Sequence, residues 1–281
     1  MSCDSNCSSC GSSASCGELK KFFAKGGIIK HIIGVMSGKG GVGKSTVTSL
    51  LANEMAKKGY RVGILDADIT GPSIPKAFGV SGKLKADSNK LMIPLETSGG
   101  IKIVSTNLIL ENENDPVLWR GPVLGGAVKQ FYDSVKWQTL DYLFVDMPPG
   151  TSDVALTIFQ SIPLDGIVMV TSPQDLVSMV VEKALNMCNK MNVKVVGLVE
   201  NMSYAICPCC NTKIEIYGKS HLEEVCLKYH LVPLARLAIN PNIANLMDSG
   251  KIEEYRTNDL DICIKEVEGI KWKNLVLTGL T

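Results

Sequence analysis

Residues 37–46, SGKGGVGKST, constrain the fold more than any other segment of this chain. They follow an apolar run of strand length, HIIGVM, and precede a stretch that predicts a helix over residues 45–58. The spacing fits G-x-x-x-x-G-K-[ST], in which glycines let successive backbone N–H groups point into one concavity at the start of a helix. Such a concavity binds phosphate, so the segment predicts a nucleotide-binding loop between a strand and a helix.

The loop also supplies side chains that a nucleotide and its metal ion need. We expect Lys44 to reach the β- and γ-phosphates and the Ser45 hydroxyl to hold Mg²⁺. The predicted nucleotide-binding residues of the loop are Gly38, Lys39, Gly40, Gly41, Val42, Gly43, Lys44, Ser45 and Thr46.

The remaining chain alternates apolar runs of strand length with longer amphipathic stretches. The runs include RVGILDAD, DYLFVD, GIVMVTS and VKVVGLVEN. This alternation predicts an α/β fold with a mostly parallel, doubly wound sheet flanked by helices. Residues 90–105 predict a hairpin, residues 111–138 a polar loop followed by a helix, and residues 175–191 a further helix.

Composition narrows the classes of function. The 281 residues carry a net charge of +1, which favours neither nucleic acid nor a membrane surface as a partner. No apolar run approaches the roughly 18 residues of a membrane helix, and the N-terminus lacks the pattern of a signal peptide. We therefore expect a cytoplasmic protein with one domain over residues 26–281 and a flexible, Cys-rich tail over residues 1–25.

In a reducing compartment, the ten cysteines are expected to be ligands, nucleophiles or core residues. Cys207 and Cys210 form C-x-x-C, which lets two thiolates bind one metal ion or cluster but cannot complete a tetrathiolate site. An iron–sulfur cluster, a zinc ion shared between two copies and a redox pair remain possible, and the role of Cys209 is open. Four tail cysteines suffice for one cluster within the chain, with zinc or no stable metal as alternatives: Cys3, Cys7, Cys10 and Cys16. Three isolated cysteines are expected to be packing residues: Cys188, Cys226 and Cys263.

Lys39, within KGGVGK, resembles the second lysine of the deviant phosphate-loop ATPases typified by MinD, ParA and the nitrogenase iron protein. The resemblance implies a homodimer in which Lys39 contacts the nucleotide of the partner and acts in catalysis together with Lys44. It also implies that Asp66 organises Mg²⁺, that Asp68 positions the attacking water, and that Asp146 in DMPPGTSD reaches Mg²⁺.

The order of longer segments narrows the resemblance to the Mrp/ApbC family of iron–sulfur cluster carrier ATPases. These segments are LDADITGPSIPKAFGV, WRGP, DMPPGTSDVALT, TSPQDL, VENMSY followed by CPCC, and DSGK. The resemblance implies that Cys207 and Cys210 of two copies hold a bridging [4Fe–4S] cluster, which ATP binding and hydrolysis help transfer to apo-proteins. Asn201 is the candidate for reading adenine, because residues 237–241, LAINP, depart from the family's usual IPLDP loop. Two alternatives are a MinD- or ParA-like positioning ATPase and an electron donor like the nitrogenase iron protein.

Overall fold

The computed structural model of the protein describes residues 23–24, 26–68, 73–105, 108, 121–174 and 179–271. Within these residues, ten strands form one sheet whose main order is β11-β10-β9-β2-β8-β3-β7-β6. Its parallel strands are β2 (Gly27–Ser37), β3 (Val62–Asp66), β7 (Lys102–Ser105), β8 (Gln138–Asp146), β9 (Gly166–Thr171), β10 (Val195–Ile206) and β12 (Pro233–Ala238), the last paired with β10. The predicted mostly parallel α/β fold is confirmed.

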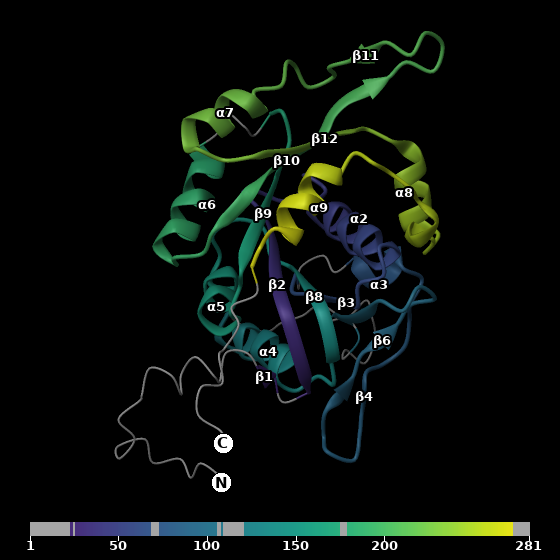
Figure 1. Cartoon of the computed structure of the whole chain (residues 1–281), viewed down its shortest axis with the longest axis vertical. Helices are drawn as coiled ribbons and strands as arrows, with labels where there is room; N and C mark the ends of the chain where they lie inside the picture. The colour runs from purple at the N-terminus through teal and green to yellow at the C-terminus, as the bar shows by residue number, and fades with distance from the viewer. Residues whose placement is uncertain are drawn as a thin grey trace.

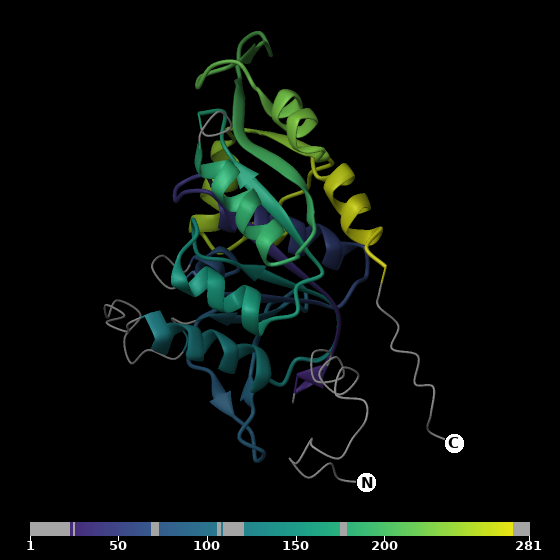
Figure 2. The same ribbon diagram turned by 90° about the vertical axis from the view of Figure 1, so that its left-hand side faces the viewer.

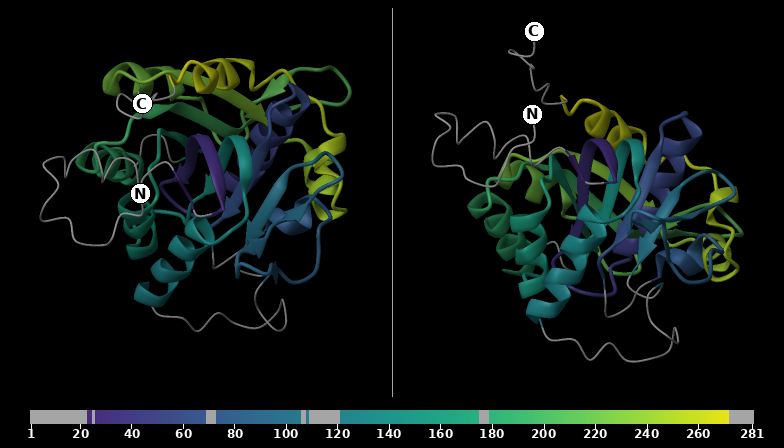
Figure 3. Two further views of the ribbon diagram at one scale, coloured as in Figure 1. Left: turned by 60° about the horizontal axis from the view of Figure 1, so that its bottom comes forward. Right: turned by 90° about the horizontal axis from the view of Figure 1, so that it is seen from below.

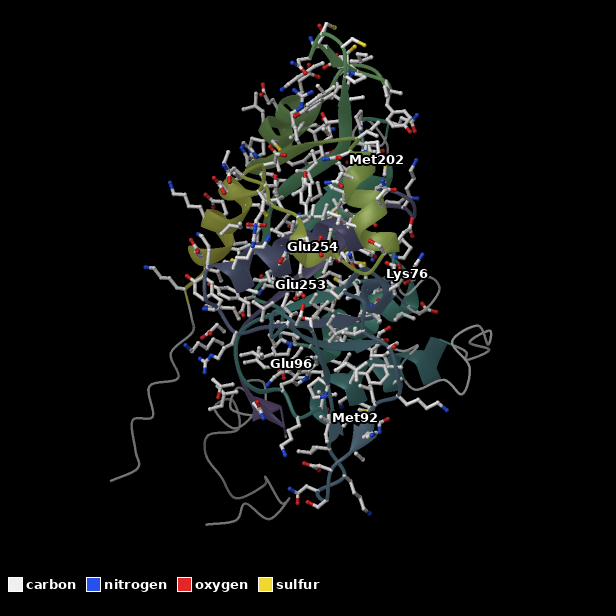
Figure 4. All side chains as sticks on the ribbon, turned by 90° about the vertical axis from the view of Figure 1, so that its right-hand side faces the viewer. Lys76, Met92, Glu96, Met202, Glu253 and Glu254 are labelled. Atoms are coloured by element: carbon white, nitrogen blue, oxygen red, sulfur yellow. The ribbon has the colours of Figure 1, made fainter. Side chains whose placement is uncertain are left out.

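Three short strands extend the sheet in antiparallel register. They are β1 (Phe23–Ala24) on β2, β6 (Leu95–Glu96) on β7, and β11 (Lys213–Ile214) on β10. The β6–β7 pair is the hairpin expected within residues 90–105, and the Ser98 hydroxyl in its turn donates a hydrogen bond of 2.6 Å to Glu253. Figure 4 shows Glu253 between the levels of Glu96 and Met202 along the long axis of the molecule.

Helices cover both faces of the sheet, as Figures 1 and 3 show. One face carries α4 (Gly121–Asp133), α5 (Asp153–Ser161), α6 (Met179–Lys190) and α7 (Leu222–Tyr229). The other carries α2 (Lys44–Lys57), α3 (Ile74–Ala77), α8 (Pro241–Asp248), the 3-10 helix η3 (Ile252–Glu254) and α9 (Asp261–Glu268). Successive side chains of a strand point to opposite faces, so Ile32 and Met36 of β2 pack on the first layer, and Ile33 and Val35 on the second.

The helices expected over residues 45–58 and 175–191, and the one expected after a polar loop within residues 111–138, are found as α2, α6 and α4. Residues 109–120 and 175–178 lie outside the described residues. Since β2, β8 and β3 are parallel neighbours, their carboxyl ends at Ser37, Asp146 and Asp66 meet at one edge of the sheet. That edge is where α/β folds place their ligands.

The two ends of the molecule are formed by small β structures. Strand β10 extends beyond the body of the sheet and pairs with β11 to form a projecting hairpin, which lies at the top of Figures 1 and 2. At the opposite end, β4 (Lys85–Ala86) and β5 (Met92–Ile93) form a separate two-stranded sheet.

Candidate functional site

The turn between β2 and α2, residues 38–43, depends on two glycines with left-handed backbone conformation. Gly41 has φ 83° and Gly43 has φ 79°, and residues other than glycine rarely adopt such backbone angles. Gly43 is also crowded, because a Cβ atom there would lie 2.1 Å from Nδ2 of Asn201. The Gly43 carbonyl accepts a hydrogen bond of 3.0 Å from the Val47 N–H, which begins α2. The predicted strand, loop and helix are therefore present in that order.

Lys44 lies among three carboxylates at the ends of β3 and β8. Its Nζ is 2.9 Å from Oδ2 of Asp146 and 3.4 Å from Oδ2 of Asp68. Burial alone would lower the pKa of Lys44, but the neighbouring aspartates outweigh burial and raise the net pKa. Lys44 therefore stays positively charged at the place where the sequence predicts phosphate.

Asp146, the last residue of β8, is fully buried and accepts hydrogen bonds from two hydroxyl groups of α2. Ser45 Oγ donates to Oδ2 at 2.6 Å, and Thr48 Oγ1 donates to Oδ1 at 2.7 Å. Both carboxylate oxygens are thus held, which fixes the orientation of Asp146. Sequence reasoning missed Thr48, although its position one helical turn after Lys44 places it on the same face of α2.

Asp66 is the partner of Asp146 in the register of β3 and β8. It is fully buried and accepts hydrogen bonds of 3.2 Å from Ser105 Oγ and from the Asp68 backbone N–H. Burial, and then the negative charge of Asp146, raise the pKa of Asp66 well above its ordinary value. The carboxylates carry more negative charge than Lys44 balances, a condition that a divalent cation relieves.

The donor set fits Mg²⁺ accompanied by a nucleotide. Among the described residues, no three Cys, His, Asp or Glu side chains form a group that could hold a metal ion by themselves. Mg²⁺ normally keeps several water molecules and takes only one or two carboxylates beside phosphate oxygens. Ser45, Asp66 and Asp146 can serve such an ion, and phosphate and water would complete its coordination.

Asn201 of β10 contacts the phosphate loop. Its Nδ2 donates a hydrogen bond of 2.9 Å to the Val42 carbonyl, and the side chain is buried. Its role at the adenine edge stays a prediction. In the LAINP segment, Asn240 caps α8 by accepting a hydrogen bond of 2.9 Å from the Asn242 N–H, and its amide donates to the Tyr255 hydroxyl at 3.1 Å.

The CPCC segment forms the turn of the hairpin between β10 and β11, which we call the cysteine hairpin, residues 204–217. The Cys207 N–H donates a hydrogen bond of 3.0 Å to the Thr212 carbonyl, and the Asn211 N–H donates one of 2.9 Å to the Cys207 carbonyl. Cys207 is half-buried, whereas Cys209 and Cys210 are exposed. Thiols held at the surface of a turn are accessible to a metal ion or cluster.

Hydrogen bonds distinguish Cys210 from its neighbours. Its Sγ lies 3.2 Å from Oγ1 of Thr212. Hydrogen bonding to the side chain and backbone of Thr212, and then to the Cys207 side chain, lowers the pKa of the Cys210 thiol. Cys207 and Cys210 therefore lie close enough to interact, as a shared ligand requires.

The family model described as ParA: NUBPL iron-transfer P-loop NTPase matches residues 28–269. The chain belongs to this family. An iron-sulfur cluster carrier protein of Clostridium perfringens is 48% identical over 236 residues, which cover 82% of this chain and 83% of that protein. The expected membership among iron–sulfur cluster carriers with a phosphate loop is thereby confirmed.

Solved structures of similar fold are also found. A nucleotide-binding protein of Archaeoglobus fulgidus in complex with ADP is 41% identical with a TM-score of 0.75, over 83% of this chain and 91% of that one. The cell division ATPase MinD of Pyrococcus furiosus is 19% identical with a TM-score of 0.61, over 86% of this chain and 98% of that one. The second likeness shows the MinD-like fold alone.

Other predicted residues of this NUBPL-family chain are exposed or lie outside the described residues. Lys39 is on the exposed side of the phosphate loop, and its action across a dimer interface stays a prediction. Four cysteines lie outside the described residues: Cys3, Cys7, Cys10 and Cys16. Throughout the described ranges, no helix is both long and apolar enough to cross a membrane.

The three cysteines expected to be packing residues are all buried. Burial raises the pKa of Cys188 and of Cys263 to about 12, and that of Cys226 to about 11. These thiols stay protonated at neutral pH and are poor ligands.

Proposed function

We propose that this NUBPL-family protein binds and hydrolyses ATP as a homodimer, and that the dimer holds a [4Fe–4S] cluster that it transfers to apo-proteins. The observation that carries the proposal is the course of β10. This one strand contacts the phosphate loop through Asn201 and ends beside Cys207, at the start of the exposed turn. The nucleotide site and the thiols therefore lie along the same strand, with Asn201 five residues before Ile206, which is next to Cys207.

The nucleotide side of the proposal assigns each residue a task. Lys44 binds the β- and γ-phosphates, while Ser45, Asp66 and Asp146 serve Mg²⁺. Asp68, which is partly exposed and 3.4 Å from Lys44 Nζ, orients the attacking water. Lys39 stabilises the charge that develops on the partner's nucleotide, which makes hydrolysis depend on the dimer.

The cluster side rests on the number of thiols and on the surface around them. Cys207 and Cys210 supply two thiolates per chain, so two copies together complete a tetrathiolate site. Four large apolar side chains on the cysteine hairpin are exposed, and a second copy would cover such side chains: Ile206, Ile214, Ile216 and Tyr217. The alternative is a zinc ion bound by the same four thiolates, and an iron count distinguishes it from a cluster.

The competing functions differ in what they require of the cysteine hairpin. A positioning ATPase of the MinD or ParA type leaves the exposed thiol pair without a task. An electron donor would use the same thiols but would keep its iron when it passes an electron on. We therefore propose apo-proteins as recipients and the cytoplasm as the location, with neither nucleic acid nor membrane as a partner.

The decisive experiment is anaerobic reconstitution of the full chain with iron and sulfide, followed by an iron count and a transfer assay with an apo-enzyme. The double variant Cys207→Ala/Cys210→Ala should lose about four iron atoms per dimer relative to wild type and should not activate the apo-enzyme. Cys209→Ala is the matched control, because it removes an exposed thiol from the same turn.

Two outcomes would replace the proposal. Unchanged iron content and transfer in the double variant would show that the cluster is held elsewhere. Reduction of an acceptor by a dimer that keeps all of its iron would favour the electron-donor alternative.

A further inference from the structure

Strand β10 is irregular between the phosphate loop and the cysteine hairpin. Its pairing with β12 joins Glu200 to Arg236 and Tyr204 to Ala238, so the two strands advance by different numbers of residues. Met202, inside this bulge, has φ 55°, a left-handed conformation. Figure 4 shows Met202 below the cysteine hairpin along the long axis of the molecule. The hydrogen-bond pattern between β10 and β12 is therefore interrupted between Asn201, which contacts the phosphate loop, and the cysteine hairpin.

Arg236 of β12 makes contacts on both sides of the bulge. Its Nε donates a hydrogen bond of 2.9 Å to Ser203 Oγ and lies 3.4 Å from Oε2 of Glu200. One terminal nitrogen of the same guanidinium lies 3.4 Å from Oε1 of Glu215, which follows β11. The guanidinium carbon is 6.0 Å from the centre of the Tyr204 ring. One side chain thus joins the base of the hairpin to the strand beneath it.

Glu200 is the fixed end of this set of contacts. It is fully buried, and it accepts a hydrogen bond from Ser203 and another of 2.9 Å from Ser220 Oγ. A buried carboxylate is costly without a cation, and Arg236 supplies that cation to Glu200. Glu200 directly precedes Asn201, whose amide donates to Val42 in the phosphate loop.

The cysteine hairpin is bound to this set by its own side chains. Lys213 lies 4.4 Å from the centre of the Tyr204 ring, so Tyr204 is contacted by two cations, Lys213 and Arg236. The guanidinium is planar and always charged, and its separate nitrogens can contact Glu200 through Nε and Glu215 through Nη2. A lysine offers one point charge and cannot span both carboxylates.

We propose that Arg236 is a positioning residue that fixes the cysteine hairpin relative to the phosphate loop, so that nucleotide binding changes the exposure of the Cys207 and Cys210 thiols. The purpose of this coupling rests on the proposed function, but the contacts do not. When nucleotide binding moves the phosphate loop, Arg236 transmits that movement across the bulge to the cysteine hairpin. Without Arg236, β10 would bend at Met202 instead.

The test uses the full chain without a cluster and measures how fast each hairpin thiol reacts with an alkylating reagent, with and without Mg·ADP. Mass-spectrometric mapping separates Cys207 and Cys210 from the other thiols. In wild type, Mg·ADP should change their rates by about fivefold or more. In Arg236→Lys and in Glu215→Gln the ratio should fall to about 1 while ADP still binds.

Two variants keep the result interpretable. Glu215 is exposed, so Glu215→Gln removes the contact to the hairpin without leaving a buried charge, and its unfolding temperature should match wild type. Lys58→Gln breaks a different exposed ion pair, 2.8 Å from Glu268 on α9, and should keep the wild-type ratio.

A wild-type ratio near 1, or a wild-type ratio that survives in Arg236→Lys and Glu215→Gln, would overturn the inference. These outcomes are separate from those of the reconstitution experiment. If the double cysteine variant still binds as much iron as wild type, the proposed function fails. The coupling of thiol exposure to Mg·ADP through Arg236 is tested by the alkylation rates alone.

Discussion

The Ser45 hydroxyl donates a hydrogen bond of 2.6 Å to the Asp146 carboxylate and thereby joins the first turn of α2 to the last residue of β8. Both residues are predicted ligands of Mg²⁺, and this hydrogen bond holds their side chains next to each other. A fixed arrangement of two ligand groups lowers the cost of binding.

Thr48→Val should destabilise the protein and weaken binding of Mg·ADP. Valine keeps the shape of threonine but removes the hydroxyl that donates to Asp146 at 2.7 Å. We expect the free energy of unfolding to fall by about 1–3 kcal/mol, because a buried carboxylate oxygen loses its donor. Urea unfolding and calorimetry would measure both effects. Thr48→Ser keeps the hydroxyl, so a serine variant as unstable as the valine variant would contradict this role.

Asp66→Asn should change how stability depends on pH. Because burial and the charge of Asp146 raise the pKa of Asp66 in the folded state, the folded protein binds this proton more tightly than the unfolded chain does. The corresponding stability is present at low pH and is lost as pH rises from 3.8 through the folded-state pKa. Urea midpoints measured across pH without Mg²⁺ should therefore fall less steeply in Asp66→Asn than in wild type.

Asp87→Asn is the control of opposite sign for that series. Hydrogen bonding from the Leu91 N–H lowers the pKa of Asp87 in the folded state. The stability that ionised Asp87 contributes is therefore present at neutral pH, and Asp87→Asn should lose it. Identical pH profiles for wild type and Asp66→Asn would show that Asp66 does not titrate as described.

Gly43→Ala should be more harmful than Gly41→Ala. Both positions have left-handed φ angles, so each alanine should cost about 1–3 kcal/mol of strain. Only at Gly43 would the new Cβ also lie 2.1 Å from Asn201 Nδ2, whereas nothing lies within 4 Å of a Cβ at Gly41. Adding Asn201→Ala should recover part of the loss in Gly43→Ala and none in Gly41→Ala. Urea unfolding of the two glycine variants, of Asn201→Ala and of the two double variants tests this. Equal costs at the two glycines would refute it.

Lys39→Ala and Lys44→Ala should separate catalysis from binding. Lys44 lies within the acidic cluster and is expected to bind phosphate, so its loss should abolish binding of Mg·ADP in calorimetry. Lys39 lies on the exposed side of the loop, so Lys39→Ala should still bind Mg·ADP. Its rate of phosphate release should fall by about 10³-fold or more, as expected for a residue that acts on the partner's nucleotide. A wild-type rate of phosphate release in Lys39→Ala would show that hydrolysis does not depend on Lys39 of a partner subunit.

The sheet could be predicted because its central strands are buried on both faces. Every residue of β3 and of β9 is buried, and their sequences, VGILD and GIVMVT, are correspondingly apolar. The extension of β10 beyond Asn201 and the two-residue strand β11 have no such signal. Their pairing depends on a turn and a bulge, which hydrophobic periodicity does not record.

The grouping of the phosphate loop, Asp66 and Asp146 could be predicted because each lies at the end of one of three adjacent parallel strands, while their roles stay predictions. Thr48 and Ser105 could not, since a hydroxyl acquires its role from the carboxylate it meets after folding. The same holds for Arg236 and Glu200, which become neighbours only when β12 pairs with β10.

The bulge in β10 also determines which changes of chain length the protein can accept. Side chains along a strand alternate between its faces, so inserting or deleting one residue between Asn201 and Cys207 would turn the thiols to the opposite side while the phosphate loop kept its support. Residues 87–91 link β4 and β5 at the far end of the molecule, so a change of length there would not alter the direction of the thiols. An alteration in length near Asn201 would therefore separate the nucleotide site from the proposed cluster site.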